Sequence, residues 1–466
     1  MKKKLTKFII LMVAAPVVTG LALGWLFSLD GTLGMSQSIS QVQFLFIAVG
    51  VLGCLGPIFA LVRRGSRILK VVAIVFATLG ILVPLAIGGF FLRSTLAYAP
   101  TTPPLLLIMD GVGTNGIPNV AITFRTAQET RNTVYYGEES LNQQYEEPAA
   151  VTEHVLPLKN LKPGAHYVWK LNDEGSCSFE TPSVQSPSST LYHFGVGGDA
   201  HLSASLTPPN SGDSTVLSGV LNYVIQPANQ FNTFFMLGDT VNMGSSFEDW
   251  QHALGIIAPF SCSVPLRPLM GNHDSYFNGA PQYMAYLYPA GMELQNGTRT
   301  YYRIDAGRVH FIMLKMLWGA DSFSVEQRAW FIKQMESIPP DDWKIVMMHS
   351  MVYASGSVID GHAYYDPADM VQQVAPLLEK YKVDLVISGH DHDLEFLQKN
   401  GVNYAVVGGL GAPLNEVATY NSPASVWYDP QQYGFLDVTV HPAAIELHFR
   451  DPQGNELKSF SIGKNQ

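Results

Sequence analysis

Residues 384–392 read Asp-Leu-Val-Ile-Ser-Gly-His-Asp-His, an apolar run that leads through one glycine into two histidines. The run at Asp384–Ser388 predicts a buried strand, because strands covered on both faces are continuously apolar. Strand ends in α/β folds deliver side chains to a common crevice, so similar runs elsewhere indicate further parts of one site. Three such runs also lead into potential metal ligands: Tyr192–Val196 into Asp199 and His201, Thr233–Leu237 into Asp239, and Lys344–Met348 into His349.

These side chains belong to five short motifs that stand in a fixed order along the chain. Together the motifs supply carboxylates, an amide and several imidazoles. Oxygen donors mixed with imidazoles suit Mn, Fe or Zn, and a pair of such cations activates water and clamps an in-line displacement at phosphorus. The set therefore predicts a two-metal site that cleaves a phosphate ester. The motifs are Asp199-Ala200-His201, Gly238-Asp239-Thr240-Val241-Asn242, Gly271-Asn272-His273-Asp274, His349 and Gly389-His390-Asp391-His392.

Residues 190–466 combine strands with helices, which is typical of a layered α/β domain. Val309–Leu314 predicts another buried strand, and Gly434–Ile462 alternates like a set of strands that completes a sheet. Ser324-Val325-Glu326-Gln327 fits a capping box that opens a helix to about Ile338. Pro367–Tyr381 predicts one further helix.

Residues 101–182 show a different pattern, with short alternating strands between turns. Val120, Ile122 and Phe124 are separated by single Ala and Thr residues, as a strand with one covered face requires. Tyr167 follows a turn and stands where a β-sandwich has its tyrosine corner. We therefore expect an all-β sandwich, joined to the α/β domain by a Ser- and Pro-rich linker at Ser183–Ser189.

Residues 1–100 contain three uncharged apolar stretches, at about Phe8–Leu29, Phe44–Val62 and Val71–Leu92. Each is close to the ~20 residues that a helix needs to cross a ~30 Å hydrocarbon layer. A retained anchor of three transmembrane helices is favoured over a cleaved signal peptide, because two further stretches follow the first. The positive-inside rule places the N-terminus and the Arg63–Lys70 loop in the cytoplasm, so the residues after Arg93 face away from it.

The charge of the chain is unevenly distributed. Of its 28 basic and 38 acidic side chains, nine basic and one acidic lie in residues 1–93, which leaves 19 basic and 37 acidic beyond them. A part that acidic is a poor partner for nucleic acid, whose binding relies on Lys and Arg. Cys177 and Cys262 could pair in an oxidising compartment, but their wide separation in the sequence favours separate buried thiols.

The ordered motifs resemble those of the calcineurin-like metallophosphoesterase family over roughly Tyr192–Ile462. The preceding sandwich is similar to the N-terminal domain of purple acid phosphatases and to fibronectin type III domains. With the apolar stretches, the resemblance implies a membrane anchor at 1–100, a fibronectin type III-like β-sandwich at 101–182 and a layered α/β metallophosphoesterase sandwich at 190–466.

The resemblance also implies a role for each motif residue. Asp239 would bridge two metal ions, and the water that they share would be hydroxide near neutral pH and attack phosphorus in line. His273 would stabilise charge on the phosphate or protonate the leaving oxygen, with Asn242 hydrogen-bonded to it and Asp274 in support. The first ion would be held by Asp199, His201 and His392, and the second by Asn272, His349 and His390.

Two positions depart from the pattern of purple acid phosphatases. Those enzymes have Gly at the position of His201 and a Tyr ligand at the position of Asn242. We therefore expect this chain to lack the iron–tyrosinate colour.

The sequence thus predicts a membrane-anchored, extracytoplasmic hydrolase with two transition-metal ions, acting on a phosphate mono- or diester of a small molecule or a lipid head group. An alternative from another class is a binding or adhesion ectodomain on an inactive phosphoesterase scaffold. The intact ligand set favours the enzyme. The sequence leaves the substrate, the metals and the oligomeric state open.

Overall fold

The computed structural model divides the chain into two compact units, Met1–Tyr98 and Ala99–Gln466. It describes residues 101–109, 115–183, 190–204, 211–276, 279–289, 292, 298–359 and 362–464. Among these residues, no helix combines the length and the apolar character that a membrane crossing requires. The three predicted transmembrane helices lie outside the described residues, and only the second unit is considered below.

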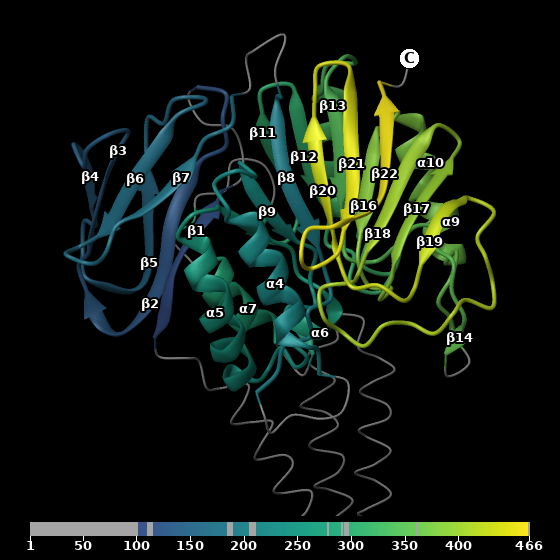
Figure 1. Ribbon diagram of the computed structural model, residues 1–466, viewed down its shortest axis with the longest axis horizontal. Coiled ribbons are helices and arrows are strands. Elements are labelled where there is room, and N and C mark those ends of the chain that lie inside the picture. The colour runs from purple at the N-terminus through teal and green to yellow at the C-terminus, as the bar shows by residue number, and fades with distance from the viewer. Residues whose placement is uncertain are drawn as a thin grey trace, which may run out of the picture. The chain divides into compact units, whose positions relative to one another are not determined.

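A nine-stranded and a seven-stranded sheet form the body of this unit (Figure 1). The first has the order β22-β21-β20-β8-β9-β10-β1-β2-β5, and the second has the order β11-β12-β13-β16-β18-β17-β19. The strands of the first are β1 (Thr102–Ile108), β2 (Val120–Thr130), β5 (Val151–Leu158), β8 (Tyr192–Gly197), β9 (Thr233–Met236), β10 (Leu266–Pro268), β20 (Phe435–Val440), β21 (Ala444–Arg450) and β22 (Glu456–Gly463). Those of the second are β11 (Tyr302–Ala306), β12 (Val309–Met313), β13 (Trp343–Met347), β16 (Leu385–Ser388), β17 (Leu394–Lys399), β18 (Val402–Val407) and β19 (Ser425–Asp429).

The two sheets pack face to face, and helices cover their outer faces. The helices are α4 (Ser214–Val224), α5 (Phe247–Ser261), α6 (Asn272–Ser275), α7 (Ala280–Leu287), α8 (Val325–Ser337), α9 (Ala368–Gln373) and α10 (Ala375–Lys380). Phe235 of β9 meets Phe311 of β12 between the sheets, with ring centroids 5.0 Å apart. The neighbouring Phe234 points the opposite way and contacts Phe260 of α5 at 5.9 Å, because successive side chains of a strand alternate between faces.

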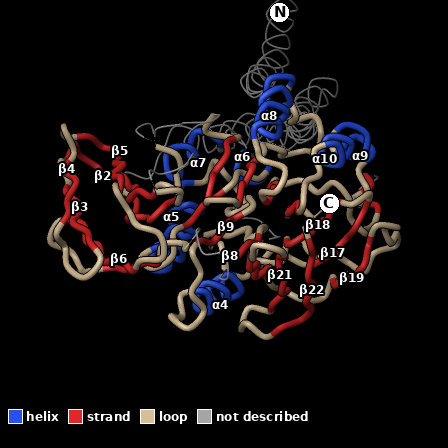
Figure 2. Tube along the Cα trace, turned by 90° about the horizontal axis from the view of Figure 1, so that it is seen from above, coloured by secondary structure: helices blue, strands red, loops and turns tan. Residues whose placement is uncertain are grey.

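On the second sheet, Phe331 of α8 and Leu378 of α10 share a core cluster with Val346 of β13. Figure 2 shows α8, α9 and α10 on one side of the strands and α4 on the opposite side. The layers therefore follow the order helix, sheet, sheet, helix, and the predicted layered α/β architecture is confirmed.

Most local predictions for this domain hold, although only the Ser324 half of the predicted capping box forms. All five buried strands form where we expected them, and the side chain of Ser324 accepts a hydrogen bond from the N–H of Gln327 at 3.2 Å at the start of α8. The single helix predicted at Pro367–Tyr381 is wrong, because the chain forms α9 and α10 with a break at Val374. Pro376 lies in the first turn of α10, where its missing N–H and its ring interrupt a continuous helix.

Residues 101–183 form the predicted β-sandwich strands in two sheets. One is the β1-β2-β5 end of the nine-stranded sheet, and the other is a separate sheet of order β4-β3-β6-β7. The hydroxyl of the buried Tyr167 accepts a hydrogen bond from the N–H of Lys162 at 3.0 Å, as a tyrosine corner does. The likeness to fibronectin type III domains stays a prediction.

The remaining strands are β3 (Thr133–Gly137), β4 (Gln143–Glu146), β6 (His166–Leu171), β7 (Cys177–Glu180), β14 (Val358–Ile359) and β15 (His362–Ala363).

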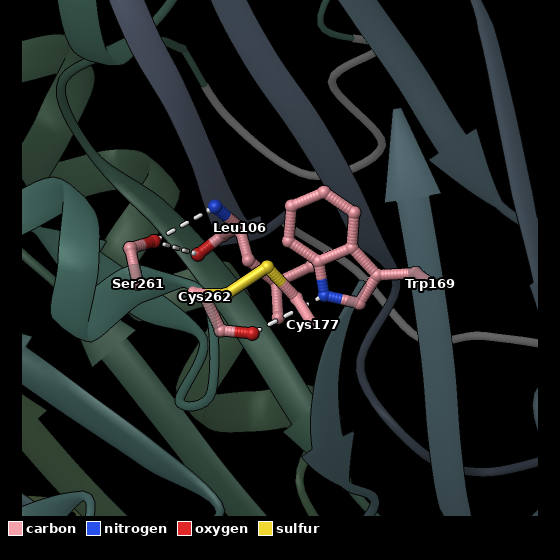
Figure 3. The surroundings of a disulfide bond; sticks show 5 residues. All are labelled: Leu106, Trp169, Cys177, Ser261 and Cys262. Carbon is pink, nitrogen blue, oxygen red and sulfur yellow. Dashed lines mark hydrogen bonds between the residues drawn. A yellow bond between two sulfur atoms is a disulfide. The ribbon is translucent and has the colours of Figure 1, made fainter. Parts of the chain in front are cut away.

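The sandwich and the α/β domain are joined through their backbones. Strand β1 pairs in parallel with β10, with Leu107 opposite Leu266, so that a single sheet runs through both domains. Beside this junction, the hydroxyl of Ser261 accepts a hydrogen bond from the N–H of Leu106 at 2.7 Å and donates one to its carbonyl oxygen at 3.1 Å (Figure 3).

A disulfide between Cys177 and Cys262 crosses the same junction (Figure 3). Our expectation of separate thiols is therefore wrong. The two residues are 85 positions apart in the sequence, but the fold brings the start of β7 and the end of α5 together with a Cα–Cα distance of 5.2 Å. That distance lies in the ordinary range for a disulfide.

The first prediction concerns the stability of this junction. The double variant Cys177→Ser/Cys262→Ser should lose about 2–5 kcal/mol of unfolding free energy, because the unfolded chain is no longer constrained by a long closed loop. Chemical denaturation measures the loss. A reductant should lower the stability of the natural protein by a similar amount and leave the double variant unchanged. Equal denaturation midpoints for the oxidised and reduced natural protein would contradict the prediction.

Candidate dinuclear metal site

Four strand ends from the two sheets meet at one place. Asp199 follows β8, Asp239 follows β9, His349 follows β13 and His390 follows β16. The N–H of His390 donates to Asp199 Oδ2 at 2.8 Å, which joins residues that are 191 positions apart in the sequence. His349 and Gly389 are similarly joined, since the N–H of Gly389 donates to the carbonyl oxygen of His349 at 3.0 Å.

Asp199, His201 and His392 form the first group of donor atoms. From Asp199 Oδ1, the distance is 3.9 Å to His201 Nε2 and 3.7 Å to His392 Nε2. Ligands about 2.1 Å from one ion can lie no more than about 4.2 Å apart. Asp199 can therefore share an ion with either histidine, and the three donor atoms all lie within 4.8 Å of one another. Of the three side chains His392 alone is partly exposed, at 21% of its side-chain area.

Asn272, His349 and His390 form the second group. Asn272 Oδ1 lies 2.8 Å from His349 Nε2 and 3.0 Å from His390 Nδ1, and those two nitrogens are 3.2 Å apart. The three atoms thus surround one point at the separations that ligands of a common ion have.

The carboxylate of Asp239 lies between the two groups. Its Oδ2 is 3.3 Å from His201 Nε2 and 3.4 Å from His349 Nε2. Its Oδ1 accepts a hydrogen bond from the N–H of His273 at 2.7 Å. The structure therefore brings all seven predicted ligands together, with Asp239 in the position that a bridging ligand needs.

Two observations indicate that these groups fit cations. Asp199 Oδ1 is buried and has no hydrogen-bond partner within the described part of the chain, although buried polar atoms are normally paired. Burial lowers the pKa of His349, but the carboxylates of Asp239 and Asp199 outweigh this and raise it to about 9. The centre of the site therefore stabilises positive charge.

Backbone carbonyl groups set the orientation of two imidazoles among the predicted ligands. His349 Nδ1 lies 2.8 Å from the carbonyl oxygen of Leu237, and His392 Nδ1 lies 2.8 Å from that of Pro413. In each case Nδ1 carries the proton that is donated, so that Nε2 is the nitrogen that faces the other donors. Such contacts outside the ligand shell fix the ring and the tautomer that a metal requires.

The backbone at four ligands is held in the left-handed region. The φ angles are 64° at Asp199, 44° at His201, 50° at Asp239 and 71° at His390. This region is unfavourable for residues with a Cβ and persists where surrounding contacts impose it, often at functional sites. Gly238, with φ 95°, has no room for a Cβ, which would lie 2.4 Å from a backbone nitrogen.

The three predicted catalytic residues, His273, Asn242 and Asp274, make different kinds of contact at the site. His273 lies beside the first group, with its ring centroid 4.1 Å from that of His201. Its Nδ1 donates to the backbone carbonyl oxygen of Asn242 at 2.9 Å. The predicted contact is therefore made by the main chain of Asn242 and not by its side-chain amide. Burial lowers the pKa of His273 to about 4, against the opposing effect of Asp239.

Asp274 positions the loops of the site. Its carboxylate accepts hydrogen bonds from the N–H of Val241 at 3.2 Å and from that of Gly271 at 3.0 Å. Asp274 therefore ties the loop of Asp239 to the loop of Asn272. Burial, with the charge of Asp239, raises its pKa to about 7.

The sequence reasoning missed the aromatic side chains around the second group, Tyr276, Trp318 and Tyr364. Single aromatic residues in loops have no characteristic spacing, so no signal in one sequence distinguishes them from residues that fill the core. Asp391 and Asp393, which flank His392 in the sequence, are both buried beside the side-chain amide of Asn415.

Comparisons with known proteins agree with this geometry. Residues 192–394 match the family model of the calcineurin-like phosphoesterases. Purple acid phosphatase 23 of Arabidopsis thaliana is 26% identical over 280 residues, which cover 54% of this chain and 58% of that protein. Probable inactive purple acid phosphatase 1 of the same plant is 23% identical over 283 residues, covering 52% and 45%. The chain thus spans about half the length of these relatives.

A solved purple acid phosphatase from yellow lupin (Lupinus luteus) seeds has the same fold. It matches with a TM-score of 0.63 and 20% identity, over 78% of this chain and 74% of that chain. The family model and the relatives support a metal-dependent phosphoesterase. Residues 192–394 therefore resemble the calcineurin-like phosphoesterases, and about half of the chain is similar to purple acid phosphatases.

Proposed function

We propose that the protein is a membrane-anchored, extracytoplasmic phosphoesterase that uses two metal ions to hydrolyse a phosphate mono- or diester. One observation carries the proposal. Asp239 Oδ2 lies within 3.4 Å of a nitrogen from each donor group, so one carboxylate can serve two ions at once. Two ions held side by side would supply the charge that acidifies a water molecule and stabilises a displacement at phosphorus.

Seven side chains of the protein are the proposed ligands of the two ions. Asp199, His201 and His392 hold one ion and Asn272, His349 and His390 hold the other, with Asp239 shared. Mn, Fe and Zn are all compatible with this mixture of oxygen and imidazole donors.

His273 has the position of a proton carrier. Because Nδ1–H is committed to the carbonyl oxygen of Asn242, Nε2 is the atom that can interact with a substrate. The neutral ring accepts a hydrogen bond there, and the protonated ring donates one to the phosphate or to the leaving oxygen. A phosphate anion nearby favours the protonated form, as the charge of Asp239 already does.

The disulfide supports the proposed location. A bond between Cys177 and Cys262 persists in oxidising compartments and is rare where glutathione and thioredoxin keep thiols reduced. This agrees with the positive-inside rule, which places residues beyond Arg93 outside the cytoplasm. The apolar stretches would act as the anchor.

A second function, a binding or adhesion ectodomain on an inactive scaffold, is favoured by one observation, the similarity to a probable inactive purple acid phosphatase. The two functions differ in what they require of the site. An enzyme needs both donor groups complete, whereas a binding module needs neither. All seven donors are present and converge, which supports the enzyme.

Neutralising the shared carboxylate should abolish hydrolysis. Asp239→Asn removes the negative charge that both ions share, and kcat/KM should fall at least about a hundred-fold, as when a main electrostatic group of an active site is lost. The assay is hydrolysis of p-nitrophenyl and bis-p-nitrophenyl phosphate with Mn, Zn and Fe in turn.

The matched control is Asp437→Asn. Asp437 is also a buried carboxylate, but it pairs with His193 and Arg450 away from the donor groups. This variant should retain turnover at temperatures where it remains folded. Unchanged turnover in folded Asp239→Asn would reject Asp239 as the shared ligand.

Metal removal provides a test that does not depend on substrate. Chelation should lower the Tm and re-addition should restore it, because an ion present at about 100 times its Kd stabilises the native state by about 2.7 kcal/mol per site. Metal analysis should find about two equivalents per chain. His349→Ala should bind less metal and show a smaller shift, whereas an identical Tm with and without chelator would count against a metal site.

A further inference from the structure

The loop that carries His201 is hydrogen-bonded to the loop that carries Asp239. The N–H of His201 donates to the carbonyl oxygen of Asp239 at 2.9 Å, and the N–H of Leu202 donates to that of Thr240 at 3.0 Å. In the other direction, the N–H of Asn242 donates to the carbonyl oxygen of Leu202 at 2.9 Å. The backbone of each loop therefore helps to place the ligand on the other.

A buried carboxylate holds the far end of the His201 loop. Asp249 Oδ1 accepts a hydrogen bond from the N–H of Ala204 at 2.9 Å. Asp249 lies in the first turn of α5, where its own N–H donates to the hydroxyl of Ser246 at 3.2 Å. Because this cap fixes the start of the helix, Asp249 ties the loop to a rigid element.

The next residue of the same helical turn holds the loop that follows Asp239. Nε1 of the buried Trp250 donates to the carbonyl oxygen of Gly244 at 2.8 Å. The N–H of Gly244 in turn donates to the carbonyl oxygen of His273 at 2.9 Å. The start of α5 is thus connected to both His201 and His273, whose ring centroids are 4.1 Å apart.

Stability alone does not explain a carboxylate at this position. The side chain of Asp249 is buried, and its Oδ2 has no hydrogen-bond partner among the described residues. Burial raises the pKa of Asp249 to about 6, although the hydrogen bond from Ala204 opposes this. A buried polar group that is left partly unpaired costs stability, and proteins retain such costs chiefly at functional sites. The contact with a ligand loop supplies a function for Asp249.

We propose that Asp249 is a positioning residue of the first donor group, and that it holds His201 where it can share an ion with Asp199. The proposal rests on the two-ion function proposed above. Removal of a group that orients a metal ligand from outside typically weakens metal binding by about 10–100-fold. Because Asp249 acts through a further stretch of backbone, we expect the lower limit, roughly ten-fold.

The test is a calorimetric titration of the metal-free protein with Zn or Mn. Asp249→Leu removes the acceptor for the N–H of Ala204, and one of the two equivalents should then bind roughly ten-fold more weakly. The other should change by less than about two-fold, because the remaining ligands lie on other loops and independent sites respond separately. Equal weakening of both equivalents, or no weakening of either, would overturn the proposal.

Two double variants identify the affected ion. With His390→Ala, which leaves the second group incomplete, Asp249→Leu should still weaken the remaining binding roughly ten-fold. With His392→Ala, which leaves the first group incomplete, Asp249→Leu should change the remaining binding by less than about two-fold. The reverse pattern would assign Asp249 to the second group and would overturn the proposal.

A conservative variant separates positioning from the effect of charge. Asp249→Asn keeps an oxygen that can accept the N–H of Ala204, so it should restore most of the metal affinity that Asp249→Leu loses. A loss as large as that of Asp249→Leu would show that the charge matters instead of the hydrogen bond, and would refute the positioning role.

The matched control is Asp384→Leu. Asp384 is also a buried carboxylate that accepts a backbone N–H, from Lys344 at 2.9 Å, but it precedes β16, whereas the ligand His390 follows the other end of that strand. At temperatures where the variant remains folded, both equivalents of metal should bind as in the natural protein.

Turnover separates failure of this proposal from failure of the hydrolase. In Asp249→Leu, kcat/KM for p-nitrophenyl phosphate should fall at limiting metal and recover at saturating metal, because excess ion refills a weakened site by mass action. Selective weakening of one ion in a protein without turnover would retain the positioning role and refute the hydrolase. Turnover that is unchanged in Asp249→Leu at limiting metal would retain the hydrolase and refute the positioning role.

Discussion

The placement of the Asp239 carboxylate governs the rest of the site. Its two oxygens contact groups from three parts of the chain: His201 after β8, His349 after β13 and the backbone of His273 in α6. The close approach leaves no room around it, since a Cβ at Gly271 would lie 2.1 Å from Asp239 Oδ1. Both sheets must therefore keep their ends in register for one carboxylate to reach both donor groups.

Electrostatics explains why such an arrangement needs a cation. Burial raises the pKa of Asp199 well above its usual value, and the charge of His349 only partly opposes this. For Asp239, burial acts in the same direction, but His349 and His273 outweigh it and hold the pKa well below its usual range. Without metal, protonated His349 is the nearest compensating charge. Ions held at the two groups would take over that role, and their binding would favour the deprotonated imidazoles.

Sequence patterns predicted the strands and the side chains that come together at the site, but not the contacts that depend on folding in three dimensions. The donors at Asp199, Asp239, His349 and His390 were predictable because buried strands have a continuous apolar run and end where the polar residues begin. The disulfide was not, since no local pattern brings Cys177 near Cys262. The main-chain contact of Asn242 could not be predicted for a related reason. A sequence motif is defined by side chains, whereas the contact that orients His273 is made by a backbone carbonyl oxygen, which every residue has.

The nine-stranded sheet has a consequence for how the protein is built. Because β1 pairs with β10, the sandwich closes an edge that the α/β domain would otherwise leave open. Open edges invite pairing with other chains. The sandwich is thus an integral part of the sheet that positions the donor groups, and a fragment that began at Leu191 would expose the edge of β10 to association with other chains. Any other domain in its place would also have to provide a strand that pairs with β10.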